Sequence, residues 1–269
     1  MKKIFTIALL LVTMMLAGCG GDSDKSNAPT SNKYSKIITV GVDDEFAPIC
    51  FRDDKGELVG FDIDLAKEAA KRMGVEFEFK PIDWDKKESE ITSGNIDMIW
   101  NGCDIMDEYK QYMIFSKPYM DNRQILLVKK GNPHDIHSLG DLENKIVATQ
   151  SGSNSEIYIN DNNDLKETFK DFVTYRNVKE GFEGLTNDKF DVLIIDEIAA
   201  RYELIKTPRT FEVVEVTVGP FTEFGIGFSK GNTELRATVQ KAFDSMVADG
   251  TAQQISEKWF QADLIKHKR

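Results

Sequence analysis

Alternating apolar and polar positions predict strands in the first part of the chain. Residues 36–43 ("KIITVGVD") alternate and are rich in β-branched side chains, which predicts a strand that the following turn residues end. Residues 75–82 and the buried run "IDMIW" at residues 96–100 predict two more strands. The polar segment "DDKGEL" at residues 53–58, between the strands predicted at residues 36–43 and 75–82, predicts a hairpin.

Helical spacing fills the intervals between these strands. In residues 62–74 the apolar side chains of Leu65, Ala69 and Met73 recur four residues apart, and a glycine closes the segment. A second helix is predicted over residues 86–92. The order strand, helix, strand, helix, strand indicates a parallel sheet.

The same alternation returns after the crossover "NRQILLVKKGN" (residues 122–132). Strands and helices are predicted in turn at residues 145–150, after 151–156, near 172–176, and at 177–187, 190–196 and 197–206. A strand at residues 224–232 and two final helices, at residues 233–250 and up to Trp259, are too few for a third domain.

The predicted fold is therefore α/β with two lobes, each a mainly parallel sheet flanked by helices. We expect the final elements to return to the first lobe, so that lobe 1 takes residues 36–120 plus 223–269, and lobe 2 takes residues 121–222. The two crossings, near residues 119–128 and 217–224, would form a two-segment hinge.

The beginning of the chain is typical of an exported lipoprotein. Lys2 and Lys3 precede an apolar run that ends in "LAGC", with Cys19 directly after two small residues. A transmembrane helix is the alternative, but the run is shorter than the roughly 20 residues that a span needs. We expect a signal peptide over residues 1–18, lipid on Cys19, and a flexible tether over residues 19–35.

Charge and cysteine content narrow the function classes. The net charge of −11 argues against a nucleic-acid partner, and the 41% hydrophobic content is that of a globular protein. Cys50 and Cys103 can pair, although two buried thiols are the expected state. His134, His137 and His267 have no partner at metal-ligand spacing, so neither a metal nor another cofactor is predicted.

Ligands of open parallel sheets bind outside the carboxyl ends of the strands. Those ends bring polar and aromatic residues together in four loops, and two lobes with these loops facing inward would form a closing cleft. The loops lie at residues 43–46, 100–104, 150–155 and 195–196, and they include Asn101 and Gln150.

Six segments in a fixed order make the chain similar to a known family. They are "GFDIDLAKEAAKRMG", "SGNIDMIWNG", "FSKPYM", "QSGSNSE", "DVLIIDE" and the stretch at residues 224–228, and the match runs from about Lys36 to Trp259. The chain resembles the extracellular solute-binding proteins that deliver polar amino acids to ABC importers. The resemblance implies a two-lobe type II fold, a lipoprotein anchor outside the cell membrane, and a hinge that closes on the ligand.

The resemblance also implies site residues. Asp43 matches a polar ligand contact, Phe46 and Trp84 match two aromatic walls, and Asp196 matches the acid that takes the α-ammonium group. A turn that helps to bind the α-carboxylate matches Gly152 and Ser153. In the family loop "G-x-T-x-T-x-E-R", two hydroxyl residues and the arginine grip that carboxylate. Here Gly102 and Glu108 remain, but the three gripping positions are Asp104, Met106 and Tyr109.

This departure predicts a cationic ligand. An arginine binds a carboxylate through two charge-assisted hydrogen bonds, which neither tyrosine nor methionine can replace. Asp104 beside a carboxylate adds repulsion. The expected cleft offers carboxylates, aromatic faces that attract ammonium groups, and two polarizable walls: Asp43, Asp104 and Asp196, then Phe46, Trp84 and Tyr109, then Cys103 and Met106.

Structural alternatives stay open for these residues. Asp43 and Asp104 can be solvated loop acids or pair with Arg123 or Lys110, and the aromatic side chains can be core. Arg123 can also swing into the cleft and restore the clamp.

Functional alternatives are an enzyme and a sensor. A dehydratase-like enzyme on the same fold would use Asp104 or Glu45 as general acid, but no nucleophile motif or phosphate loop supports it. A sensory domain would normally continue into a transmembrane helix. We therefore expect a monomeric, non-enzymatic binding protein whose partners are a small amino acid or amine and an ABC permease.

Overall fold

The computed structural model describes residues 37–266. The predicted signal peptide, the lipidation site Cys19 and the tether lie outside these residues, as does His267. Within residues 37–266, no helix combines the length and the apolar character that crossing a membrane requires.

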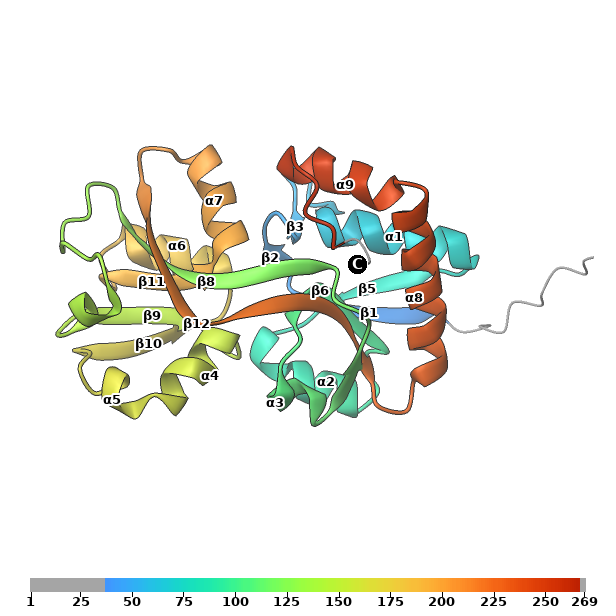
Figure 1. Cartoon of the computed structure of the whole chain (residues 1–269), viewed down its shortest axis with the longest axis horizontal. Coiled ribbons are helices and arrows are strands. Elements are labelled where there is room, and N and C mark those ends of the chain that lie inside the picture. Colours follow the sequence, from blue (N-terminus) through green and yellow to red (C-terminus); the bar gives the residue numbers. More distant parts are fainter. Residues whose placement is uncertain (1–36, 267–269) are drawn as a thin grey trace, which may run out of the picture. The chain divides into compact units, whose positions relative to one another are not determined.

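A nine-stranded mixed sheet runs through the described part of the chain in the order β10-β9-β11-β8-β12-β6-β1-β5, with β7 paired to β12 (Figure 1). Its strands are β1 (Ile38–Val42), β5 (Phe77–Pro81), β6 (Met98–Asp104), β7 (Met113–Phe115), β8 (Met120–Lys129), β9 (Ile146–Gln150), β10 (Asp171–Tyr175), β11 (Val192–Asp196) and β12 (Phe211–Ser229). A small second sheet contains β2 (Glu45–Phe46), β3 (Cys50–Arg52) and β4 (Leu58–Val59), and the predicted hairpin joins β3 to β4.

Helices cover the sheet in two groups, one for each lobe (Figure 1). The first group consists of α1 (Phe61–Met73), the short η1 (Trp84–Lys86), α2 (Lys87–Thr92), α3 (Asp107–Lys110), α8 (Thr233–Ala248) and α9 (Thr251–Phe260). The second consists of η2 (Leu139–Leu142), α4 (Asn154–Asp161), α5 (Asn163–Lys166), α6 (Val178–Thr186) and α7 (Glu197–Lys206).

Parallel pairing follows the predicted alternation within each lobe. β1 pairs in parallel with β5 and β6, and β9 pairs in parallel with β10 and β11. The buried face of α1 carries Leu65, Ala66 and Ala69, and the helix ends at Gly74 in the left-handed conformation that glycine tolerates. Apolar spacing therefore marks the helix faces that build the core, and the alternation of strands and helices agrees with the parallel pairing within each lobe.

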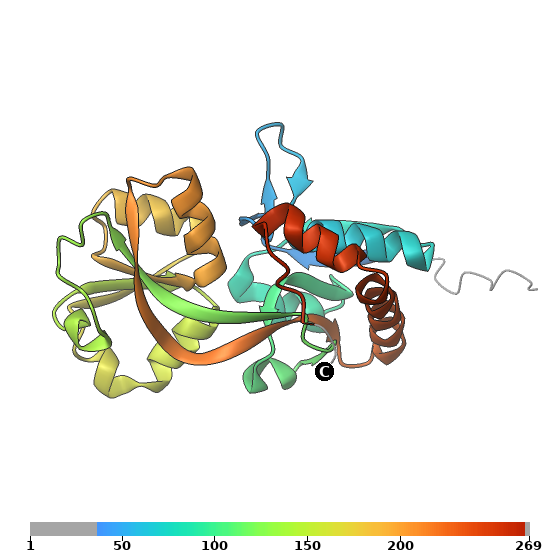
Figure 2. The ribbon, with the colours of Figure 1, turned by 45° about the horizontal axis from the view of Figure 1, so that its top comes forward.

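Two long antiparallel strands, β8 and β12, connect the lobes (Figure 2). Their pairing has two register shifts, between Val214 and Thr217 and between Val218 and Thr222. The predicted crossover at residues 122–132 is thus largely a strand, and β12 begins well before the strand expected at residue 224. In β8 the continuous buried run from Gln124 to Val128 hides the strand periodicity, whereas residues 211–218 of β12 alternate and were not recognised as a strand. The residue limits of the two lobes stay a prediction.

Candidate functional site

A small cavity lies at the carboxyl ends of the strands, where the lobes meet. Its volume is about 20 Å³, which is room for about one water molecule. Side chains from both lobes and from the connecting strand β8 line it: Asp43, Phe46, Trp84, Asn101, Gly102, Asp104, Tyr109, Gln124, Gln150, Ser153 and Asp196. Ten of the twelve residues predicted from the sequence are brought together here, and Gln124 is the addition.

Two of the predicted residues do not line the cavity. Cys103 faces away from Asp104 because side chains alternate along β6, and its buried thiol packs in an apolar cluster with Met113. Met106 precedes α3 and lines a separate outer groove beside the exposed Phe221. Neither side chain lines the cavity in this structure, and their contact with a ligand stays a prediction. Cys50 and Cys103 are both buried free thiols.

Asp43 is held by donors from both lobes. Its Oδ1 accepts from the backbone nitrogen of Glu45 at 3.0 Å, and its Oδ2 accepts from Nε2 of Gln150 at 2.8 Å. Burial is the largest effect on this carboxyl and raises its pKa to about 6, although both hydrogen bonds act in the opposite direction. The contact with Gln150 links the end of β1 to the end of β9 across the cavity.

Asp104 and Asp196 form a second acidic position, joined by one amide group. Nδ2 of Asn122 donates to Oδ1 of Asp104 at 3.0 Å and to Oδ1 of Asp196 at 2.6 Å. Asn154 and Thr222 donate to Asp104 at 2.7 and 2.5 Å, and Gln124 donates to Asp196 at 2.6 Å. Every donor to this pair comes from lobe 2 or from the connecting strands.

The pair carries more negative charge than its surroundings favour. Burial raises the pKa of Asp104 and of Asp196 well above the usual carboxyl range, and repulsion by Asp196 raises that of Asp104 further. The hydrogen bonds from Asn122, Thr222 and Gln124 lower these pKa values only in part. A cation placed beside the pair would therefore be attracted strongly.

Aromatic rings form the remaining walls. Phe46 and Trp84 line the cavity, and Gly102 lies between the rings of Phe46 and Phe224. Gly102 has φ of +55°, and a Cβ atom there would come within 2.8 Å of Phe46 Cε1. Only glycine suits both the left-handed backbone and this close ring contact. Its backbone nitrogen donates to the buried carboxylate of Asp62 at 2.6 Å, which fixes the loop from behind.

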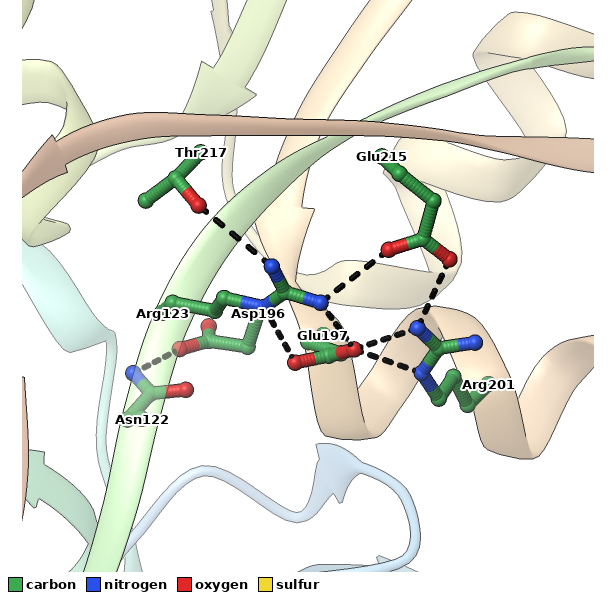
Figure 3. Close-up of polar contacts among 7 residues, drawn as sticks. All are labelled: Asn122, Arg123, Asp196, Glu197, Arg201, Glu215 and Thr217. Atoms are coloured by element: carbon green, nitrogen blue, oxygen red, sulfur yellow. Dashed lines mark hydrogen bonds and ion pairs between the residues drawn. The ribbon is translucent and has the colours of Figure 1, made fainter. Parts of the chain in front are cut away.

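Arg123 does not restore the missing clamp. Its guanidinium binds both carboxylate oxygens of Glu197, at 2.5 and 2.7 Å, and also contacts Glu215 and Thr217 (Figure 3). Asn122 and Gln124 precede and follow it on β8, and alternation along the strand places their side chains on the cavity side and Arg123 on the other. The pairing of Asp104 with Lys110 does not occur either, because Lys110 binds Asp107 at 2.8 Å.

A buried lysine beside the site was not anticipated. Lys87, the first residue of α2, is 4% exposed. Its ammonium nitrogen lies over the rings of Tyr109 and Trp84, 4.5 and 5.1 Å from their centroids. It donates to the backbone oxygen of Gly152 at 2.6 Å, and the Tyr109 hydroxyl donates to the same oxygen at 2.9 Å. Tyr109 thus faces the cavity and contacts lobe 2.

Hydrogen-bonding capacity remains unused in the cavity wall. Asn101 is 1% exposed, and neither atom of its side-chain amide has a partner among the described residues. Ser153 caps α4, so the backbone nitrogens of the first turn of that helix begin at the cavity. The wall can therefore donate to and accept from a polar ligand.

Glu45, the alternative general acid suggested by the sequence, lines an outer groove with Phe51 and Tyr202 rather than this cavity. Within residues 37–266, no group of three or more histidine, cysteine or acidic side chains has an arrangement suited to a metal ion.

Comparison with known proteins agrees with this fold. The L-cystine-binding protein TcyJ of Escherichia coli strain K12 is 35% identical over 263 residues, which cover 96% of each chain. The L-cystine-binding protein TcyA of Bacillus subtilis strain 168 is 30% identical over 99% of this chain and 100% of its own. A crystal structure of an ABC uptake transporter substrate binding protein from Streptococcus pneumoniae with bound histidine has a TM-score of 0.81 and 36% identity, covering 86% of this chain and 95% of that one.

The family model of bacterial extracellular solute-binding proteins, family 3, matches residues 38–262. This match spans both lobes and both connecting strands, and thus every residue of the cavity. The chain belongs to the bacterial extracellular solute-binding proteins, family 3.

Proposed function

We propose that this protein captures an amino acid with two basic nitrogens outside the cell and delivers it to the permease of an ABC importer. Family membership supports the class of function, and the histidine-bound relative from Streptococcus pneumoniae belongs to an ABC uptake transporter. The distribution of charge in the cavity supports the class of ligand.

The observation that carries the proposal is the presence of two separate acidic positions in one cavity. Asp43 forms the first, at the end of β1, and Asp104 with Asp196 forms the second. Amide nitrogens of Gln150, Asn122 and other residues now donate to these carboxylates, in the positions that a ligand's ammonium groups would take. A ligand with a single ammonium group would leave one position without a cationic partner, which is costly in a buried site.

L-Cystine is our first candidate, followed by the basic amino acids. Two relatives named for L-cystine binding are 35% and 30% identical to this chain over nearly its whole length. The two ammonium groups of L-cystine match the two acidic positions. Its carboxylates can bind the backbone nitrogens at the start of α4, where a helix N-terminus favours negative charge.

Binding should close the lobes. Asp43, Phe46 and Asp104 belong to the first lobe, and Ser153 and Asp196 belong to the second, so a ligand that contacts both groups favours the closed arrangement. The cavity is too small for an amino acid to enter from solvent, which implies that the lobes separate first. Small-angle scattering with and without ligand should therefore give a smaller radius of gyration in the bound state.

We further propose that the protein acts without catalysis, as a monomer tethered by lipid on Cys19 to the outer face of the cell membrane. The family consists of extracellular solute-binding proteins, which supports binding rather than chemistry. Both oxygens of Asp104, the acid that a dehydratase-like activity would use, accept hydrogen bonds from protein side chains.

Thermal-shift measurements on four amino acids test the ligand proposal. L-Cystine, L-arginine, L-histidine and L-glutamine at one concentration should raise the melting temperature by mass action, L-cystine most and L-glutamine least. Mass spectrometry of the small molecule that copurifies with the protein provides an independent identification. A larger shift with L-glutamine than with the other three would refute the proposal that the ligand carries two basic nitrogens.

A further inference from the structure

The turn between β9 and α4 touches the opposite lobe at Gly152. This glycine has φ of +75°, and a Cβ atom there would lie 2.7 Å from Cα of Asp85 and 3.2 Å from the backbone oxygen of Trp84. Both neighbours are backbone atoms that cannot move aside easily. Glycine therefore permits the lobes to approach at this point more closely than any other residue would.

Two donors from the first lobe converge on the backbone oxygen of Gly152. The ammonium group of Lys87 donates at 2.6 Å, and the hydroxyl of Tyr109 donates at 2.9 Å. Lys87 begins α2 and Tyr109 belongs to α3, so separate helices of the first lobe grip one atom of the second. These two hydrogen bonds exist only while the lobes are in contact.

The surroundings of Lys87 are unusual for a structural lysine. It is 4% exposed, and its only other hydrogen bond goes to the backbone oxygen of Trp84 at 3.3 Å. Among residues 37–266, no carboxylate lies within ion-pair distance of its ammonium group. Burial lowers the pKa of Lys87 to about 8, and the nearby carboxylates of Asp85, Glu156 and Asp104 oppose that shift only in part. A buried cation without a direct ion pair is costly to keep, so stability alone does not explain it.

We propose that Lys87 and Tyr109 form a latch that slows release of the ligand by holding Gly152. In the resembling family, the position of Tyr109 is an arginine that grips the ligand's carboxylate directly. Here the tyrosine hydroxyl and the Lys87 ammonium grip the second lobe instead, and the aromatic faces of Trp84 and Tyr109 stabilise the ammonium group. The proposal rests on the proposed function only in that a ligand must bind between the lobes.

Stopped-flow measurement of tryptophan fluorescence, with L-cystine as the probe, tests the latch. Contacts made after encounter change the dissociation rate far more than the association rate. Lys87→Met should raise the dissociation rate by about 10- to 100-fold, since a charge-assisted hydrogen bond contributes in that range, while the association rate stays within about twofold. Tyr109→Phe, which loses one neutral hydrogen bond, should raise it by about threefold to tenfold.

Lys86→Met is the matched control, because Lys86 adjoins Lys87 but is exposed and paired with Asp83. Its rates should equal those of the wild-type protein within about twofold. The double variant Lys87→Met/Tyr109→Phe should dissociate faster than the product of the single effects predicts, because each single variant leaves the shared acceptor one donor and only the double variant leaves it with neither.

Thermal unfolding of the ligand-free proteins separates a latch from a structural role. Lys87→Met should leave the melting temperature unchanged or raise it, whereas a lysine needed for folding would lower it. If L-cystine fails to bind but L-histidine, L-arginine or L-glutamine binds, the ligand proposal fails and the same rates are measured with that amino acid. An unchanged dissociation rate in Lys87→Met, or a faster rate accompanied by a lower melting temperature, would overturn the latch.

Discussion

Two polar clusters in this protein are built from residues that are neighbours in the sequence. Asn122 donates to Asp196, which lines the cavity, whereas Arg123 and Glu197, the next residue in each case, bind each other in a separate cluster (Figure 3). The cavity cluster holds the carboxylates of Asp104 and Asp196 with their amide donors, and no lysine or arginine within residues 37–266 forms an ion pair with them. The outer cluster pairs Arg123 and Arg201 with Glu197 and Glu215.

The two clusters differ in the charge of the groups that donate to their carboxylates. In the outer cluster each acid has an arginine at hydrogen-bond distance, and these ion pairs lower the pKa of Glu197 and raise that of Arg123. In the cavity cluster burial raises the pKa values of Asp104 and Asp196, and the hydrogen bonds from neutral groups oppose this effect only in part. The carboxylates of the outer cluster are thus paired with arginines, whereas we expect those of the cavity cluster to pair with the ammonium groups of a ligand.

The largest expected effect comes from removing one charge of the cavity cluster. Asp196→Asn should weaken binding of L-cystine by about 2–5 kcal/mol, the cost of losing one partner of a desolvated charge pair. Glu197→Gln, its neighbour in the outer cluster, should change the affinity by less than about twofold, because exposed pairs contribute little at a distance. Titration calorimetry measures both, and a loss below about tenfold for Asp196→Asn would place it outside the binding contacts.

A second effect follows from pH. Because burial raises the pKa of Asp43 to about 6 and that of the Asp104–Asp196 pair above the usual range, protons compete with the ligand's ammonium groups as the pH falls. Lowering the pH from 7.5 to 5 should weaken binding by about tenfold for each acidic position. The ion pair of Arg123 with Glu197 should stay charged over this range, because hydrogen bonds from Arg123 and Arg201 lower the pKa of Glu197. Equal affinities at the two pH values would contradict the assignment of charge to the cavity.

Stability should respond in the opposite sense. The raised pKa of Asp104 means that the folded protein binds more protons than the unfolded chain between pH ~4 and ~7, so stability decreases as the pH rises through that window. Asp104→Asn should raise the ligand-free unfolding free energy by about 1–3 kcal/mol at pH 8 and change it little at pH 4.

The side-chain Oδ1 of Asn154 has no hydrogen-bond partner among the described residues. If the side-chain amide of Asn154 flips, this oxygen can accept a hydrogen bond from the new asparagine amide, so the substitution can be accommodated. Urea denaturation at the two pH values measures the effect. A loss of stability at pH 8 would show that the charge of Asp104 stabilises the ligand-free fold.

The smallest expected effect belongs to the outer cluster. Arg123→Gln removes a two-point contact with Glu197 at a partly exposed site, and it should lower the unfolding free energy by about 1 kcal/mol, an effect that high salt diminishes. Binding of L-cystine should stay within about twofold of the wild-type value. A marked loss of affinity would mean that Arg123 reaches the ligand in solution.

Local patterns in the sequence predicted much of the fold. The helix predicted at residues 62–74 is α1 to within one residue at each end, and α7 covers the whole segment predicted at residues 197–206. The connecting strands were harder, because β8 contains the apolar run "ILLV", which reads equally as a crossover. Its pairing with β12 depends on residues about 90 positions away, which local periodicity does not report.

The site was predictable where a strand end and the family pattern coincide, as at Asp43 and Asp196. Alternation on β8 would have placed Asn122 and Gln124 opposite Arg123, had residues 122–132 been recognised as a strand. The residues around Lys87 gave no indication that its side chain is buried, since a lysine at the start of a short helix is normally exposed. Its burial arises from contact between the lobes, which a single sequence does not display.

The ratio of two dissociation constants distinguishes a cavity with two acidic positions from a cavity with one. Titration calorimetry of the unmodified protein at pH 7.5 with L-cystine and with L-glutamine compares a ligand for two acidic positions with a ligand for one. L-Cystine should bind at least about tenfold more tightly, which is the effect of one additional ammonium–carboxylate contact in a buried site. L-Glutamine binding as tightly as L-cystine, or more tightly, would contradict it.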